Sequence, residues 1–193
     1  MVKGLKGEDF KGHLRIKVGG VERRYDVDNI EDFMPILLPF VGRKLRERIE
    51  EPISIVPIPN SDMAVGKKGD FRIMQLARLV ASGFGPGATV VPAVLWDKPR
   101  QKAHLGKDFR HPDVYEPHMF LGEKPKSPVV LFDDVITSGS QMIAAARMLT
   151  KNGFPPVRGL AIARATKQQH PRPFLHEHEG ELELSQPIFN LED

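Results

Sequence analysis

The chain has 193 residues, 40% of them hydrophobic, which is enough for one α/β domain with a core and additions at its ends. No apolar run approaches the roughly 20 residues that span a bilayer, no secretory signal is apparent at the start, and the lack of cysteine excludes disulfides and thiolate metal sites and favours a cytoplasmic location. The net charge of +3 suits a polyanionic metabolite or a weak nucleic-acid surface, but no basic stripe with interleaved aromatic residues favours nucleic acid as a partner.

The first part of the chain predicts a hairpin and a helix. Residues 13–18 and 23–27 flank a Gly-Gly pair and read as the two strands of a β-hairpin. Residues 31–50 look helical, but Pro35 and Pro39 should break the first half of that helix. We therefore expect a small N-terminal decoration made of a hairpin and a broken helix.

The next elements alternate between strands and a helix. Residues 53–58 have the apolar character of a strand in a parallel sheet. Asp70 is placed to cap a helix that Gly83 should end. Residues 89–95 predict a further strand, in which Pro92 indicates an edge position or a bulge.

The second half of the chain continues this alternation after an irregular segment. Residues 97–118 are polar and basic and show little periodicity. A strand over 129–133, a helix over 140–151 ended by Gly153 and a strand over 157–163 follow. Strands that alternate with helices predict an α/β fold with a parallel sheet flanked by helices.

The most informative segment joins the strand from residue 129 to the helix that follows it. Four apolar residues run directly into Asp133 and Asp134, at the carboxyl end of a strand, where open α/β sheets bind ligands. The turn over 137–140, which contains Gly139, would present backbone N–H groups at a helix N-terminus, and such groups suit a phosphate. Carboxylates can accept hydrogen bonds from the vicinal hydroxyls of a sugar. Their position next to a phosphate-binding turn therefore favours a sugar phosphate as the ligand.

Two other interpretations fit this segment less well. A plain buried strand followed by a solvated turn explains residues 129–132, but not two adjacent carboxylates followed by Thr-Ser-Gly-Ser. A receiver domain also has paired aspartates at a strand end, but there the pair usually comes near the chain start and lacks the hydroxyl-rich turn with glycine.

Residues 129–140 closely resemble the ribose-phosphate signature of the type I phosphoribosyltransferases. That signature has four apolar residues, two acids, two apolar residues, two small residues and a glycine, and this chain follows it through Gly139. It departs at Gln141, where many members carry threonine. The resemblance implies the type I phosphoribosyltransferase fold, with a decoration over 1–50, a core over 51–167 and a C-terminal tail over 168–193.

A weaker resemblance points to the ComF-like branch of that family. Residues 55–59, Ile-Val-Pro-Ile-Pro, are similar to the strand end Val-Pro-Val-Pro of that branch. The segment Lys68-Gly69-Asp70-Phe71-Arg72 keeps the spacing of the branch but departs from its Arg-Gly-Phe-Asn-Gln, and its cysteine-rich zinc module is absent. These departures leave the substrate open.

The resemblance implies that phosphoribosyl pyrophosphate (PRPP) reacts at its ribose C1 with a nitrogenous base or nucleotide, while pyrophosphate leaves with Mg²⁺. Asp133 and Asp134 would bind the ribose hydroxyls and would contact Mg²⁺ mainly through PRPP. The 5′-phosphate would lie against the residues that follow, which are Val135, Ile136, Thr137, Ser138, Gly139, Ser140 and Gln141. As alternatives, the acids would be a solvated strand end and Gln141 an exposed residue in the first turn of a helix.

The other candidate residues would serve the pyrophosphate. Asn60 and Ser61 follow the first sheet strand, where the family cups pyrophosphate, although Asn-Ser is also ordinary turn chemistry. Positive charge would come from the catalytic candidates Arg100 and Lys102 in a loop that closes over the ligand, and from the binding candidates Lys68 and Arg110. A solvated basic surface or a disordered loop is the alternative for these cations.

The remaining motifs are weak. His170, His176 and His178 could suggest a metal site but are also typical of an exposed tail, and Trp96 is interpreted as a packing residue. Two functions stay open: a Mg²⁺-dependent phosphoribosyltransferase, or a non-catalytic protein of this fold that binds PRPP or a nucleotide as a regulator or as a ComF-like accessory of DNA uptake. A homodimer is compatible with either.

Overall fold

The structure is a computed structural model, and it describes residues 13–100, 111–126, 128–165 and 180. Its centre is a four-stranded parallel sheet with the order β4-β3-β7-β8. The sheet strands are β3 (Ile53–Pro57), β4 (Ala88–Val90), β7 (Val129–Ile136) and β8 (Pro156–Arg164). The predicted α/β class with a parallel sheet is thereby confirmed.

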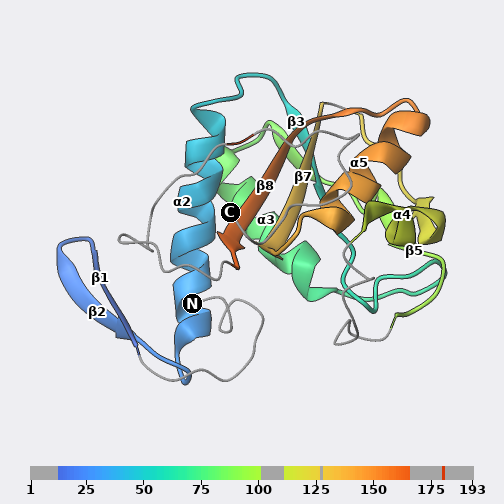
Figure 1. Cartoon of the computed structure of the whole chain (residues 1–193). Coiled ribbons are helices and arrows are strands. Elements are labelled where there is room, and N and C mark those ends of the chain that lie inside the picture. The colour runs from blue at the N-terminus through green and yellow to red at the C-terminus, as the bar shows by residue number, and fades with distance from the viewer. Residues whose placement is uncertain (1–12, 101–110, 127, 166–179, 181–193) are drawn as a thin grey trace.

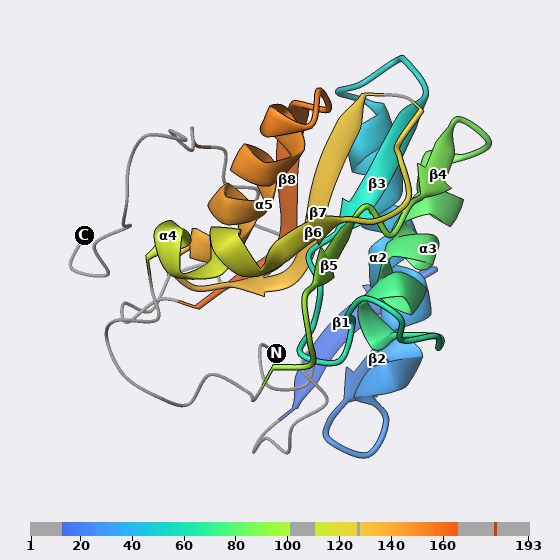
Figure 2. The same cartoon turned by 90° about the vertical axis from the view of Figure 1, so that its right-hand side faces the viewer.

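Helices cover both faces of this sheet (Figure 1). Figure 2 shows α5 on one side of β3, β7 and β8, and α2 and α3 on the other. The three helices are α2 (Met34–Arg46), α3 (Arg72–Phe84) and α5 (Ser140–Lys151). Side chains that alternate along β3 enter two cores, since Ile55 belongs to the core under α2 and α3 and Val56 to the core under α5.

Smaller elements surround the sheet. The predicted hairpin is present, and a 3-10 helix leads from it into α2, while two short strands form a separate antiparallel pair. These elements are β1 (Leu14–Val18), β2 (Val21–Tyr25), η1 (Ile30–Phe33), β5 (Val94–Trp96), α4 (Pro112–Tyr115), η3 (Glu116–His118) and β6 (Met119–Leu121). The predicted domain division remains a prediction, and of its C-terminal tail only Gly180 lies within the described residues.

Several sequence predictions about these elements were wrong. The strand predicted over 89–95 is two strands, because the chain leaves β3 after Val90 and β5 then pairs with β6 instead of the main sheet. β4 is an edge strand, as Pro92 indicated. Asp70 does not cap α3, since Phe71 holds the N-cap position without a side-chain bond, while Asp70 accepts hydrogen bonds from Gln75 and Arg78.

The third error concerns α2, which runs unbroken past Pro39. Pro35 lies in the first turn, where proline fits, but Pro39 lacks the N–H that would bond to the carbonyl of Pro35. Tertiary packing offsets this loss, because α2 lies against α3 at a very close approach. A Cβ on Gly83 would lie only 1.9 Å from the carbonyl oxygen of Pro39, and one on Gly42 only 2.0 Å from that of Val80. Gly83 therefore serves helix packing, and α3 ends one residue later.

This close approach gives a prediction for stability. We expect Gly83→Ala to destabilise the fold by about 1–3 kcal/mol or more, because the new methyl group forces the two helix backbones apart. Urea denaturation measures the free energy of unfolding. Gly69→Ala is the control, since a Cβ there would meet only the Phe71 ring at 4.0 Å. Equal stability of the two variants would contradict the close packing of α2 on α3.

Candidate functional site

The segment singled out in the sequence lies at the switch point of the sheet. The chain passes outward from β3 to β4 on one side and from β7 to β8 on the other, so the two connections run in opposite directions. Open α/β sheets bind ligands outside the carboxyl ends of the strands at such a point. β3 ends at Pro57, opposite Phe132, whereas β7 continues to Ile136 beside β8 alone. The last residues of β7 thus extend beyond the end of β3.

Asp133 and Asp134 are the residues of β7 that pass this point, and both are half-buried. They lie within the strand, which is three residues longer than predicted. Asp133 Oδ1 accepts a hydrogen bond of 2.9 Å from the N–H of Asp134, and Asp134 Oδ1 accepts one of 2.7 Å from the N–H of Val135. These bonds fix the orientation of both carboxylates through one oxygen each.

The two acids also interrupt the alternation of the strand. Up to Phe132, even-numbered residues enter the core under α2 and α3 and odd-numbered residues enter the core under α5. Beyond the acids this order is reversed, since Val135 belongs to the α2 and α3 core and Ile136 packs on the other. In a regular strand, neighbouring side chains point to opposite faces of the sheet. Because the alternation shifts by one residue between Phe132 and Val135, the carboxylates of Asp133 and Asp134 need not point to opposite faces.

The turn after β7 begins α5. Gly139 has φ +73° and ψ 0°, a left-handed conformation that strains a residue with a Cβ, and it is the N-cap of the helix. The first helical bond runs from the N–H of Ile143 to the carbonyl of Gly139 at 2.9 Å. The N–H groups of the first turn before it have no helical acceptor, and they carry the positive end of the helix dipole.

The hydroxyls of this turn differ from one another in exposure. Thr137 is exposed, whereas Ser138 and Ser140 are buried and their Oγ atoms lie 2.9 Å apart in a hydrogen bond. One of the two serine protons is used within that pair. Gln141 is half-buried in the first turn of α5. The turn therefore offers mainly backbone N–H groups and the Thr137 hydroxyl.

The loop after β3 continues the sheet ladder beside β7 by one bond, from the N–H of Ile58 to the carbonyl of Phe132 at 2.7 Å. The predicted pair Asn60 and Ser61 follows. Asn60 Oδ1 is buried without a hydrogen-bond partner in the described part of the chain. The Ser61 carbonyl accepts a bond of 2.8 Å from the N–H of Arg100, so the loop contacts the basic segment directly.

Arg100 lies against two aromatic rings, Trp96 and Tyr115, whose centroids are 6.1 Å apart. Its guanidinium carbon lies 5.0 Å from the ring centroid of Trp96 and 5.9 Å from that of Tyr115, within cation–π range. Its Nη1 is buried without a hydrogen-bond partner among the described residues. Buried donors of this kind are rare in native proteins and call for a ligand or another partner.

The positions of the other predicted cations, Lys68, Lys102 and Arg110, add little to the description of the site. Lys68 is exposed in the stretch between β3 and α3. Lys102 and Arg110, and the histidines of the C-terminal tail, lie outside the described residues. Within the described ranges no three His, Cys, Asp or Glu side chains gather closely enough to hold a metal ion. No helix in those ranges has the length and apolar character to cross a membrane.

Sequence reasoning missed the role of Trp96 in this region. The residue does pack, being 2% exposed, but its indole N–H also donates to the carbonyls of Pro59 and Asn60, both at 3.0 Å. The signal available in the sequence was its position directly before a basic segment. The fold alone brings it to the loop after β3.

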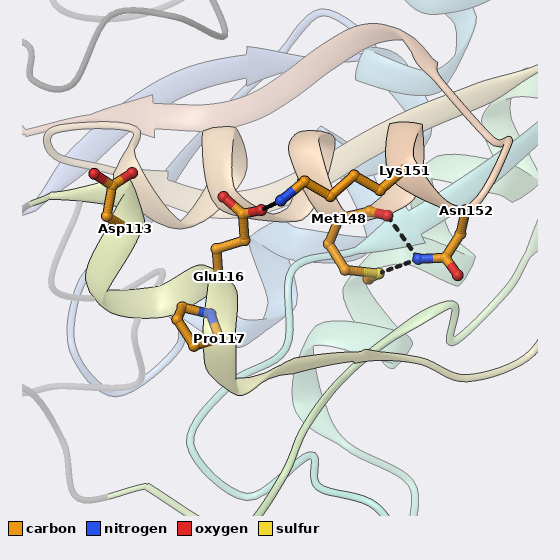
Figure 3. A pocket seen from close by; sticks show the side chains of 6 residues that line it. All are labelled: Asp113, Glu116, Pro117, Met148, Lys151 and Asn152. Carbon is orange, nitrogen blue, oxygen red and sulfur yellow. Dashed lines mark hydrogen bonds and ion pairs between the residues drawn. The ribbon is translucent and has the colours of Figure 1, made fainter.

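A cavity of about 420 Å³ lies elsewhere, at the carboxyl end of α5 and thus at the opposite end of that helix from the Gly139 turn (Figure 3). Its charged and polar side chains already interact with one another or with α5. Lys151 is paired with Glu116, and the Asn152 amide donates to the Met148 carbonyl. Asp113 is paired with Arg147. We therefore place the candidate site at the switch point and not in this cavity.

A half-buried pair, Asp97 and His118, fixes the start of the basic segment. Asp97 Oδ2 lies 2.9 Å from His118 Nδ1, and the N–H of Asp97 donates to the His118 carbonyl at 2.9 Å. The pKa of Asp97 is lowered from its ordinary value of 3.8, chiefly by the hydrogen bond from His118 and less by the N–H of Lys98, against the opposing effect of desolvation.

This lowered pKa predicts a pH-dependent contribution to stability. Because the folded pKa of Asp97 lies below the unfolded one, the contribution is complete above the unfolded pKa and is lost as pH falls through the folded pKa. We expect Asp97→Asn to be less stable than the parent at neutral pH, and the gap to close at acid pH. Urea denaturation across that range measures it. In a His118→Ala background the same change should lose most of its pH dependence, and an unchanged dependence would contradict the pairing.

Comparison with known proteins gives distant structural neighbours. No family model matches the chain, and no curated protein does. It is similar to a hypoxanthine phosphoribosyltransferase from Staphylococcus aureus, at a TM-score of 0.42 and 8% identity over 84% of this chain and 76% of the other. It is also similar to an orotate phosphoribosyltransferase from Aeropyrum pernix, at 0.40 and 15% over 85% and 94%. Such scores assign neither a family nor an activity to this chain.

Proposed function

We propose that this protein is a phosphoribosyltransferase, which transfers the 5-phosphoribosyl group between PRPP and a nitrogenous acceptor with release of pyrophosphate. One observation carries the proposal: two half-buried carboxylates, Asp133 and Asp134, extend past β3 at the switch point and lead directly into the Gly139 turn at the start of α5. Acceptors for vicinal hydroxyls and donors for a phosphate are thus adjacent along the chain, as a ribose 5-phosphate requires.

The carboxylates would act on the sugar. Each has an oxygen fixed by a backbone N–H, which leaves the group oriented before the ligand arrives. They would accept hydrogen bonds from the ribose hydroxyls, and their charge would stabilise the positive charge that develops on the sugar as pyrophosphate departs. The reaction exchanges one bond at C1, from a pyrophosphate oxygen to an acceptor nitrogen.

The turn would hold the 5′-phosphate. The candidates in the turn are the Thr137 hydroxyl, the Ser138–Ser140 pair and the N–H of Gln141. Val135 and Ile136 precede the turn in β7, where the Val135 N–H already donates to Asp134 Oδ1. Gly139 permits a close approach because it has no side chain and adopts a positive φ. Charge-assisted hydrogen bonds contribute about 1.5–3 kcal/mol each, so a few of them suffice to anchor the group.

The pyrophosphate would lie toward the loop after β3. Asn60 and Ser61 belong to that loop, and Arg100 is joined to it through its backbone. The buried Nη1 of Arg100 is a donor of the kind that a phosphate oxygen accepts. Lys68, Lys102 and Arg110 are proposed to add positive charge there.

The residues also fit Mg²⁺. This ion is usually bound by one or two carboxylates together with substrate phosphates, and does not need an all-protein cage. The PRPP oxygens would supply most of the ligands, and Asp133 and Asp134 would contact the ion mainly through PRPP. When bound, Mg²⁺ would neutralise charge on the leaving pyrophosphate. We also propose that the protein is cytoplasmic. A homodimer and membership of the ComF-like branch are further proposals.

The test combines binding with turnover. Calorimetry with PRPP and Mg²⁺ should show binding, and a panel of purine and pyrimidine bases, orotate included, should reveal an acceptor that releases pyrophosphate. Binding without turnover for any base would favour the PRPP-binding regulator instead. Failure to bind PRPP would contradict both.

A further inference from the structure

Trp96 joins two parts of the chain that lie far apart in sequence. Its indole N–H donates to the carbonyls of Pro59 and Asn60. Its backbone N–H donates to the Met63 carbonyl at 3.0 Å, and its carbonyl accepts from the N–H of Val65 at 2.9 Å. The tryptophan therefore contacts the loop after β3 near its beginning and again a few residues later, so one side chain and its own backbone fix the whole turn.

The ring of Trp96 fixes Arg100 at the same time. The guanidinium carbon lies 5.0 Å from the ring centroid of Trp96 and 5.9 Å from that of Tyr115. The N–H of Arg100 donates to the carbonyl of Ser61. The loop after β3 and the Arg100 guanidinium both contact the Trp96 ring, and the backbone of Arg100 also bonds to the loop. A shift of that ring would therefore displace both the loop and the guanidinium.

Two buried polar atoms in this set have no hydrogen-bond partner among the described residues, Asn60 Oδ1 and Arg100 Nη1. Trp96 contacts both residues that carry these atoms, which a role in core packing alone does not require. Trp96 is itself 2% exposed and packs with Val94 in the core under α5, so its ring cannot reorient freely.

We propose that Trp96 is a positioning residue of the switch-point site, which holds the loop over 59–65 and the guanidinium of Arg100 in one arrangement ready for an anion. The identity of that anion as pyrophosphate, free or as part of PRPP, rests on the proposed function. The positioning itself does not, and it can be tested without a ligand.

The first measurement uses the parent without ligand. Trp96 is the only tryptophan of the chain, so the intrinsic fluorescence of the indole reports on this residue alone. Arg100→Met removes the cation from the ring face and should shift the emission in wavelength or intensity. A control change at an exposed cation far from the ring, Lys17→Met in β1, should leave it unaltered, because β1 and β5 lie on opposite sides of the molecule (Figure 1). Identical spectra of the parent and Arg100→Met would overturn the contact on which the proposal depends.

The second measurement compares two variants of the same strand. Trp96→Phe keeps an aromatic ring but loses the N–H, and Val94→Ala destabilises β5 while both indole hydrogen bonds to the loop remain. After correction for global unfolding, trypsin should cleave after Arg100 about ten-fold faster in Trp96→Phe than in Val94→Ala, as expected for the loss of hydrogen bonds to two carbonyls. Equal cleavage would show a merely structural role and would overturn the proposal.

The third measurement separates this inference from the proposed function. Calorimetry with Mg²⁺ and inorganic pyrophosphate, and then with PRPP, should give a dissociation constant about ten-fold higher for Trp96→Phe than for Val94→Ala. If the parent binds and Trp96→Phe binds equally well, the positioning role is wrong and the function stands. If the parent binds neither probe, the function is wrong, and fluorescence and proteolysis still decide the positioning.

Discussion

Replacing both acids, Asp133→Asn with Asp134→Asn, is expected to weaken PRPP binding by at least about 2 kcal/mol, or roughly 30-fold in the dissociation constant. The loss is expected because the ribose hydroxyls would then donate to neutral amide oxygens instead of charged carboxylates, and such hydrogen bonds are weaker. Folding should survive, because each asparagine retains an Oδ1 that can accept the backbone N–H now bonded to the aspartate. Calorimetry with PRPP and Mg²⁺ measures the effect.

A matched control separates this effect from a change in net charge. Glu31→Gln with Asp32→Asn removes the same two negative charges from an adjacent, exposed pair in η1. PRPP affinity should stay close to that of the parent. If the two double variants lose affinity equally, the acids at the end of β7 act only through the overall charge, and their assignment to the ribose fails.

Replacing Gly139 with valine is expected to have the second large effect, a loss of about 100-fold or more in affinity for 5′-phosphorylated sugars. Valine is strained at φ +73°, and its branched side chain would stand where the phosphate approaches the turn. Affinity for unphosphorylated ribose, if measurable, should change little. Titration of the two sugars, with and without the phosphate, measures the difference.

Gly153→Val is the control for backbone strain, since Gly153 has φ +85° at the other end of α5 and a Cβ there meets nothing within 4 Å. It should destabilise the fold by a similar amount and leave binding of the sugar phosphate intact in the folded protein. Equal loss of binding in both variants would mean that α5 unfolds as a unit, and the turn would then have no demonstrated role.

The sequence was most informative where local signals agree. Four apolar residues, two acids and a small turn predict the existence of β7 and the start of α5, because strand burial, turn chemistry and helix entry all depend on neighbouring residues. The end of β7 was predicted three residues too early. The structure places these residues at a switch point, which the order of predicted elements alone does not specify. That β3 lies on one side of β7 and β8 on the other is decided by packing across the whole sheet.

Long-range packing explains what could not be predicted. Pro39 argues against a helix, and only the close approach of Gly83 from α3 shows why α2 continues. The split of residues 89–95 depends on β6, a three-residue strand with too little pattern to be recognised. The contacts of Trp96 with Asn60 and Arg100 depend on the fold that brings β5 to the loop after β3.

The most direct test of the proposed site is a crystal structure of the protein soaked with PRPP and Mg²⁺. The ribose hydroxyls are expected within hydrogen-bond distance of Asp133 and Asp134, with the 5′-phosphate against the turn over 137–141 and the pyrophosphate toward Asn60 and Arg100. PRPP bound in the cavity beside Glu116 and Lys151, or at any place away from the carboxyl ends of β3 and β7, would contradict the site and the function proposed from it.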